Sequence, residues 1–312
     1  MGTRWAATVD ADTSVDLAGL QRDLASAVQQ VDAQMSPWKP DSDLMRLNRA
    51  PVGDWVEVSD EIAEVLEAAL AVQRLSAGAF NPGVGALVDA WGFGAARDEP
   101  DAAAIGAARQ SLPRATQAGI EVDRSAGRAR RHAPIQIDLC GIAKGYAVDR
   151  MVQVLQQHGV RHALASLDGE LRAVGAQASG EPWAVALERP ERTRRAVQGV
   201  LALADMAVAT SGDYRRSLQV GETSIAHTMD ARRGAPVHNT VASVTVLAPT
   251  CMQADAWATA LLVAGPEEGL IMAQRMGLEA LILLRKGQGL TELGLGRFGT
   301  VADRSSHPYP AA

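Results

Sequence analysis

One short segment places two oxygen-bearing side chains one helical turn apart. Asp255 and Thr259 stand four residues from each other in Asp255-Ala256-Trp257-Ala258-Thr259, so a helix would bring a carboxylate and a hydroxyl onto the same face. Mg²⁺ prefers oxygen ligands and usually takes few of them from the protein, keeping water or phosphate oxygens for the rest. The same pattern also fits a plain helix start with Asp255 as its cap, so both interpretations stay open.

A second segment could bind a phosphate group. Asp138-Leu139-Cys140-Gly141-Ile142-Ala143-Lys144-Gly145-Tyr146 is a glycine-bracketed turn between a strand-like and a helix-like stretch. Free N–H groups at a helix start, with Lys144 beside them, suit a phosphate. The P-loop pattern G-x-x-x-x-G-K-[ST] is absent, so this is not that motif. An ordinary turn from strand to helix explains the segment equally well.

Four further stretches could contact a ligand, and each has a plain structural alternative. The hydroxyl residues around the glycine of Ala209–Tyr214 allow close approach to a ligand, or form a simple turn. His227, three residues before Asp230, could be an oriented base or a structural histidine. Trp38 could stack on a flat ring or anchor a loop, and the glycine-aromatic loop Gly78–Gly85 has the same character.

The spacing of apolar residues predicts the elements that would hold these side chains. Helices are expected at 14–35 with Ser14 as N-cap, Asp60–Leu75 with Ser59 as N-cap, Tyr146–Gln157, Ala254–Val263 and Glu267–Arg275. Strands are expected at Arg4–Val9, Pro134–Leu139, His162–Leu167, Trp183–Leu187, Val200–Ala209, Val241–Leu247 and Ala280–Leu284. Strands outnumber helices and occur in runs, which favours an α+β fold over a regular βαβ repeat.

Composition limits the classes of protein that this chain could be. Its 312 residues are 47% apolar, enough for a sizeable core, and its net charge of −6 argues against nucleic acid bound by bulk electrostatics. No apolar run approaches the roughly 20 residues of a membrane span. The two cysteines, Cys140 and Cys251, do not make a disulfide scaffold.

The first residues carry a prediction about location. Met1-Gly2-Thr3-Arg4-Trp5 has neither the basic segment nor the apolar segment of a signal peptide. A cytoplasmic protein is therefore expected. The alternative is a periplasmic or lipid-anchored protein whose signal peptide has been removed.

Taken in order, these stretches resemble the FAD:protein FMN transferases, the ApbE family. The most specific matches are Gly141–Asp149, Ala209–Tyr214, His227 with Asp230, and Ala254–Ala260. The similarity extends from Met1 to Ala280–Leu284. It implies one large α+β domain over residues 1–303, related to the T-fold, with mixed or antiparallel sheets flanked by helices and FAD in a central cleft. Residues 304–312 are expected to form a loose C-terminal tail.

The resemblance also implies an activity. Family members take FAD, release AMP and leave FMN esterified through its phosphate to a threonine or serine of a flavoprotein. The implied reaction is a Mg²⁺-dependent phosphoryl transfer with FAD as substrate. The implied partner is an acceptor flavoprotein with a short Thr- or Ser-containing motif.

Roles for individual residues follow from the same resemblance. Asp255 and Thr259 match side-chain ligands of Mg²⁺, and the backbone carbonyl at Gly141 matches a third ligand. His227 matches the residue that takes the proton from the acceptor hydroxyl. The implied FAD contacts are Met1, Trp38, Ala79, Phe80, Asn81, Asp138, Lys144 and Met229. Trp38 stands where the family usually has tyrosine, and an aromatic ring there would shield the site from water.

Three departures from the family pattern are visible. Cys140 replaces a usual glycine or serine, Asn81 replaces a common aspartate, and Leu167–Leu171 stands in place of a Gly-Gly-Asp run. Asp168 in that run would weaken FAD binding if it faced the pyrophosphate, unless a metal or Lys144 offset its charge. It could instead point away or offer the metal another oxygen.

Two other functions compete with FMN transfer. An FAD pyrophosphatase would use water as acceptor and release free FMN and AMP. A non-catalytic FAD-binding protein would bind the dinucleotide and never produce AMP. Incubation with FAD and Mg²⁺, with and without an acceptor, separates the three.

Overall fold

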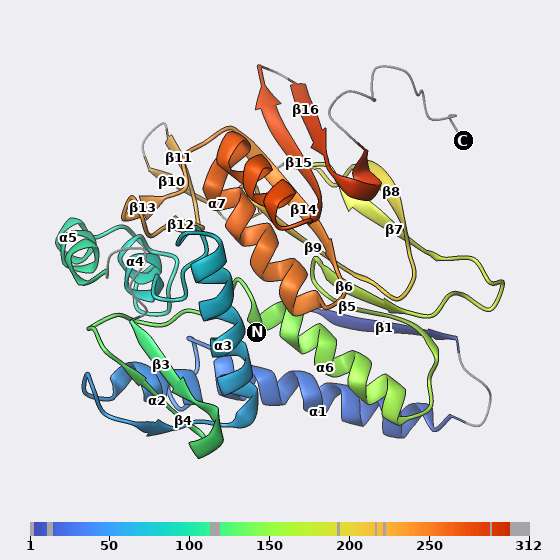
Figure 1. The fold of residues 1–312 in the computed structure, drawn as a ribbon, viewed down its shortest axis with the longest axis horizontal. Helices are drawn as coiled ribbons and strands as arrows, with labels where there is room; N and C mark the ends of the chain where they lie inside the picture. The colour runs from blue at the N-terminus through green and yellow to red at the C-terminus, as the bar shows by residue number, and fades with distance from the viewer. Residues whose placement is uncertain are drawn as a thin grey trace.

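A seven-stranded sheet forms the centre of the computed structural model, which describes residues 3–10, 15–112, 119–191, 194–215, 217–220, 223–287 and 289–299. Its strand order is β1-β5-β6-β9-β14-β15-β16, and each of these pairings is antiparallel (Figure 1). The strands are β1 (Trp5–Asp10), β5 (His162–Leu167), β6 (Glu170–Val174), β9 (Ala207–Gly212), β14 (Val241–Ala248), β15 (Glu279–Lys286) and β16 (Gly289–Gly294).

Helices cover one face of this sheet. Helices α6 and α7 pack on it, and α1 packs against α6 (Figure 1). The helices are α1 (Leu17–Met35), α2 (Asp43–Arg49), α3 (Asp60–Leu75), α4 (Gly85–Ala90), α5 (Ala102–Ser111), α6 (Ala143–Gln157) and α7 (Cys251–Arg275). Among the described helices, none has both the length and the apolar content needed to cross a bilayer.

Short sheets complete the molecule. They pair β2 (Val56–Glu57) and β3 (Ile120–Asp123) with β4 (Arg128–Arg131), β7 (Trp183–Glu188) with β8 (Val197–Leu203), β10 (Ser217–Val220) with β11 (Thr223–Ala226), and β12 (Met229–Asp230) with β13 (Ala235–Pro236). Two short 3₁₀ helices are η1 (Arg124–Ala126) and η2 (Gly296–Phe298). Trp183, Leu201 and Leu203 of the β7–β8 hairpin join a core cluster with Val208, Leu247 and Leu283 of the central sheet. Helices and antiparallel strands are thus segregated, which confirms the α+β prediction.

Helix starts follow the chemistry of their capping residues. Ser59 caps α3 as predicted, because its hydroxyl accepts the backbone N–H of Ile62 at 3.4 Å. The predicted cap at Ser14 is wrong: the N-cap of α1 is Asp16, whose carboxylate accepts the N–H of Ala18 at 3.1 Å. Ser14 itself lies outside the described residues, as do Met1 and the predicted tail 304–312.

Two predicted strands are wrong. The segment 134–139 has one isolated bridge, from Gln136 to Val84. The N–H of Ile137 donates to the side chain of Asn48 in α2, and that of Asp138 donates to the carbonyl of Pro82, so neither joins a strand ladder. The predicted strand Val200–Ala209 is divided into β8 and β9, because the chain turns at Asp205, which has a φ of 49°.

The two C-terminal helices form one kinked element. Helix α7 runs from Cys251 to Arg275, and the predicted gap coincides with a break at Gly265, which has a φ of 83°, followed by Pro266. The N-cap is Thr250, whose hydroxyl accepts the N–H of Gln253 at 3.3 Å. Asp255 therefore lies inside the helix, and its alternative interpretation as a cap is wrong.

Candidate functional site

A cavity of about 910 Å³ lies where the helices, the central sheet and the β7–β8 hairpin meet. Its volume is within the range of sites for cofactors and small molecules. The cavity is lined by every predicted site residue that the structure describes, namely Trp38, Ala79, Phe80, Asn81, Asp138, Gly141, Lys144, His227, Met229, Asp255 and Thr259. Met1, the remaining predicted residue, lies outside the described part of the chain.

The starts of α6 and α7 are locked together at one wall of this cavity. The N–H of Gly145 donates to a carboxylate oxygen of Asp255 at 3.0 Å, and Asp255 is only 2% exposed. A Cβ atom at Gly145 would lie 2.2 Å from the carbonyl oxygen of Cys251, so only glycine permits this approach. The carboxylate of Asp149 accepts the N–H groups of Cys251 and Met252, each at 2.9 Å. The Gly141–Asp149 motif therefore fixes where Asp255 sits.

Asp255, Thr259 and the backbone at Gly141 all line the cavity beside this junction. The Thr259 hydroxyl lies 3.1 Å from the Ser211 hydroxyl, and a Cβ atom at Gly141 would lie 3.1 Å from the Thr259 oxygen. Burial raises the pKa of Asp255, since the charged carboxylate has lost its hydration. A divalent cation here would restore that lost stabilisation, so the residues present fit Mg²⁺.

A search for clustered metal-binding side chains does not find the proposed Mg²⁺ site. Among the described residues, no group of three or more His, Cys, Asp or Glu side chains could hold a metal ion. A cation in this cavity would therefore combine at most two such side chains with other oxygens, such as those of hydroxyls and carbonyls. That is the combination offered by Asp255, Thr259 and the backbone at Gly141.

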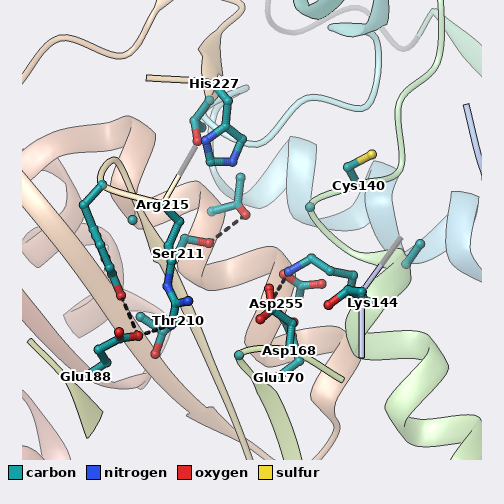
Figure 2. Close-up of a pocket in the computed structure, with 18 of the residues that line it drawn as sticks. Cys140, Lys144, Asp168, Glu170, Glu188, Thr210, Ser211, Arg215, His227 and Asp255 are labelled. Carbon is teal, nitrogen blue, oxygen red and sulfur yellow. Dashed lines mark hydrogen bonds and ion pairs between the residues drawn. The ribbon is translucent and has the colours of Figure 1, made fainter. Parts of the chain in front are cut away.

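Lys144 stands among carboxylates at the same wall (Figure 2). Its ammonium forms an ion pair with Glu170, which is 1% exposed, and Asp168 lines the same cavity. Burial disfavours the ammonium, but the charges of Asp255 and Glu170 outweigh it and raise the pKa of Lys144. For Glu170, burial has the opposite effect and raises the pKa of the carboxyl group to about 7. Its Oε2 atom has no hydrogen-bond partner within the described residues.

The turn that follows Asp138 is tied to the glycine-aromatic loop Gly78–Gly85. The carboxylate of Asp138 accepts the N–H of Cys140 at 2.6 Å, and the N–H of Asp138 donates to the carbonyl of Pro82 at 2.8 Å. Asn81 accepts the N–H of Gly83 at 2.8 Å, which folds that loop back on itself. Two segments far apart in sequence therefore form one wall of the cavity.

His227 approaches from another wall. It lies between β11 and β12, and its ring meets Phe93 edge-on with the ring centroids 6.3 Å apart. Figure 2 shows its ring apart from the cluster of Lys144 and Asp255, and above that cluster in this view. An imidazole in this position can serve as a base for a group that enters between these walls.

Sequence reasoning missed several lining residues. Ser211 belongs to the quoted Ala209–Tyr214 motif, but its contact with Thr259 has no signal in the spacing. Glu188, which pairs with Arg215 beside Tyr214, also lines the cavity. These contacts join β9 to α7 and β7 to the segment after β9, so only the folded chain reveals them.

Several proteins of similar sequence carry the name FAD:protein FMN transferase. The model of the ApbE family matches residues 1–282. The chain is 33% identical over 273 residues to an FAD:protein FMN transferase of Haemophilus influenzae, covering 86% of this chain and 79% of the relative. It is 32% identical over 295 residues to an FAD:protein FMN transferase of Klebsiella pneumoniae, covering 93% and 83%.

Solved structures agree with the sequence comparison. The flavin transferase ApbE of Vibrio cholerae superposes with a TM-score of 0.85 at 31% identity, covering 96% of this chain and 95% of the other. The apo flavinyl transferase ApbE of Pseudomonas stutzeri gives 0.82 at 32% identity, covering 94% and 92%. The match of sequence, of fold and of the motifs gathered at one cavity leads to one conclusion: the chain belongs to the ApbE family.

Proposed function

We propose that this protein transfers FMN from FAD to a threonine or serine hydroxyl of an acceptor flavoprotein and releases AMP. One observation carries the proposal: the oxygen donors at Asp255 and Thr259, the Lys144 ammonium and the His227 imidazole all line one cavity of cofactor size. These groups are what a phosphoryl transfer requires, namely charge neutralisation, positioning and a base. The names of the relatives, FAD:protein FMN transferase, support the same reaction.

Each group has a part in that reaction. Asp255, Thr259 and the carbonyl at Gly141 would hold Mg²⁺, which when bound neutralises charge on the pyrophosphate. Lys144 binds the pyrophosphate as a point charge. His227 takes the proton of the acceptor hydroxyl while that oxygen attacks the phosphorus of the FMN half. The bond from this phosphorus to the bridging oxygen breaks, and AMP leaves with the electron pair.

Other residues would contact FAD. We assign this role to Met1, which lies outside the described residues, and to the lining residues Trp38, Ala79, Phe80, Asn81, Asp138 and Met229. Trp38 lines the cavity and is 44% exposed, and its aromatic ring would stack on the flavin. A ring in that position would limit the access of water and so favour transfer over hydrolysis.

Mass spectrometry tests the proposal directly. The protein, FAD and Mg²⁺ are incubated with a candidate acceptor, and the acceptor is expected to gain the mass of FMN at a Thr or Ser while AMP accumulates. Rapid release of free FMN and AMP without acceptor would instead indicate an FAD pyrophosphatase. Bound FAD that never yields AMP, with or without acceptor, would indicate a binding protein.

A further inference from the structure

The kink in α7 frees backbone carbonyls close to the proposed metal ligands. Pro266 has no N–H, so the carbonyl of Leu262 loses the partner it would have in a continuous helix. The non-helical Gly265 interrupts the pattern at the same place. Buried carbonyls need other donors, and the chain supplies them from the segment that follows His227.

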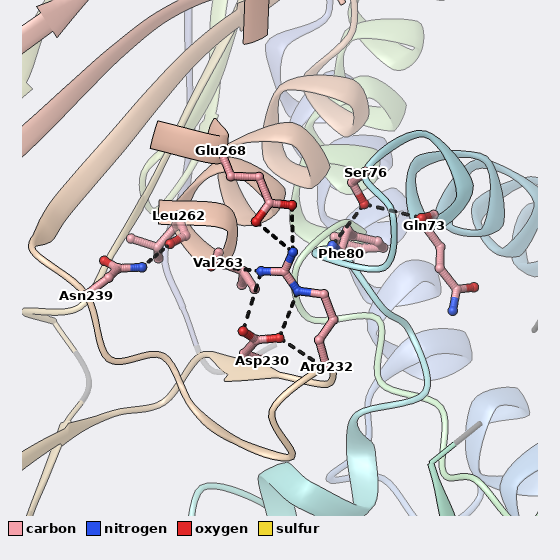
Figure 3. Close-up of polar contacts among 9 residues, drawn as sticks. All are labelled: Gln73, Ser76, Phe80, Asp230, Arg232, Asn239, Leu262, Val263 and Glu268. Carbon is pink, nitrogen blue, oxygen red and sulfur yellow. Dashed lines mark hydrogen bonds and ion pairs between the residues drawn. The ribbon is translucent and has the colours of Figure 1, made fainter. Parts of the chain in front are cut away.

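Two side chains of that segment reach the freed carbonyls (Figure 3). Asn239 donates to the carbonyl of Leu262 at 3.0 Å, and Arg232 donates to that of Val263 at 3.5 Å. The guanidinium of Arg232 also lies 3.2 Å from Asp230 and donates to both oxygens of Glu268, at 2.7 and 2.9 Å. Arg232 thus joins the two halves of the kinked helix to the turn that bears Asp230.

The segment between these anchors is itself rigidly bonded. Strand β12 pairs with β13, and the N–H of Val237 donates to the carbonyl of Thr228 at 2.9 Å. Asp230, at the end of β12, is 4% exposed. His227 immediately precedes this hairpin, so displacement of the hairpin would displace the proposed base.

The contacts of Arg232 therefore connect the helix that bears the proposed metal ligands with the hairpin that follows the proposed base. Asp255 and Thr259 lie on α7 ahead of the kink, while His227 lies at the start of the hairpin. We propose that Arg232 is a positioning residue that sets the place of His227 relative to the metal ligands on α7. The inference rests on the proposed function, since it assigns a role to the position of the base.

The first test compares neighbouring arginines. We expect Arg232→Ala to lower kcat for FMN transfer by about 10- to 100-fold, because small misplacements of reacting groups are costly. The Kd for FAD with Mg²⁺ should change by less than about threefold, since the side chains at Lys144, Asp255 and Thr259 remain. Arg233→Ala, an exposed neighbour in the same turn, is the control and should leave both quantities unchanged.

Milder variants guard against a general loss of folding. Arg232→Lys keeps the charge but loses the forked contacts, and Glu268→Gln weakens one partner that is 46% exposed. Both should fold and lose part of the transfer rate. Full kcat in both variants and in Arg232→Ala would overturn the proposal.

A double-mutant cycle separates positioning from mere stability. His227→Ala should slow transfer by about 10²- to 10⁴-fold with FAD binding retained. In that background Arg232→Ala should cost less than about twofold, because the group that it positions is gone. An equal loss in both backgrounds would overturn the inference.

One readout does not need the transfer reaction. Amide hydrogen exchange within residues 228–237 should accelerate in Arg232→Ala and stay unchanged in Arg233→Ala. Unchanged exchange in Arg232→Ala would overturn the inference whatever the activity. A wild-type protein that never flavinylates an acceptor, or a His227→Ala variant with full rate, would instead count against the proposed function.

Discussion

Among single residues, Lys144 has an ammonium that is already surrounded by carboxylates. Its ammonium is paired with the buried Glu170, and Asp255 and Asp168 contribute further negative charge. On the proposed function, a pyrophosphate beside Lys144 would add more negative charge. A cation at Asp255 and Thr259 would offset it, because one ammonium is outnumbered by these groups.

The burial of Glu170 predicts how stability depends on pH. Its folded-state pKa of about 7 lies above the ordinary 4.5, so the folded state holds this proton longer than the unfolded state does. Stability is then lost as pH rises from about 5 to about 8. Glu170→Gln, which cannot lose a proton, should gain stability relative to the wild type over that interval. Urea unfolding at both ends of the interval measures this, and a gap that narrows as pH rises would contradict it.

The proposed metal ligands can be tested by removing one oxygen at a time. Asp255→Asn keeps an acceptor for the Gly145 N–H but removes the charge. We expect the Mg²⁺ concentration for half-maximal transfer to rise by more than about 10-fold, the lower end seen for groups that only support a ligand. Thr259→Val should also weaken the response to Mg²⁺, whereas Thr259→Ser keeps the hydroxyl and serves as the control. Full turnover of the wild type in excess EDTA would exclude the assignment.

At the scale of elements, the contact of α6 with α7 depends on one glycine. Gly145→Ala would place a methyl group against the Cys251 carbonyl, a backbone atom that cannot rotate away. We expect a loss of about 1–3 kcal/mol in the free energy of unfolding, together with weaker Mg²⁺ binding. The matched control is Gly106→Ala in α5, where a Cβ atom meets nothing within 4 Å. That change should be neutral or stabilise by about 0.5–1 kcal/mol.

The element boundaries show where sequence reasoning succeeds. The sequence predicts the Ser59 cap because capping depends on neighbouring residues, and a gap between two helical patterns marks the Gly265–Pro266 break. Alternating apolar residues predict a strand at 134–139, and Ile135, Ile137 and Leu139 are indeed buried. Alternation reports which side chains are buried, and it does not say where the backbone hydrogen bonds go.

In the candidate site, too, local contacts could be predicted from the sequence and long-range contacts could not. The spacing of four between Asp255 and Thr259 predicted a shared helix face, and the structure brings both to the cavity. The pairing of Lys144 with Glu170 joins α6 to β6, and no local spacing encodes it. Roles assigned through family resemblance, such as the proton transfer by His227, stay predictions until they are measured.

For the molecule as a whole, the cavity exists only when several parts of the fold have come together. Its walls come from the helices, the central sheet and the β7–β8 hairpin. Ligands that bind only this folded arrangement stabilise it by mass action. FAD and Mg²⁺ together should therefore raise the melting temperature by more than the sum of their separate effects. Differential scanning fluorimetry with EDTA and with Asp255→Asn as controls tests this, and purely additive shifts would contradict the coupling.

The wide separation of the lining residues along the chain has a consequence for synthesis. Trp38 lies near the start and Thr259 lies within the last quarter of the sequence, yet both face one cavity. A ribosome delivers the chain from its N-terminus, so the pocket has no complete form until nearly all of the protein has emerged. Flavin nucleotide in the surrounding solution therefore has no complete pocket to bind while the first part of the chain folds.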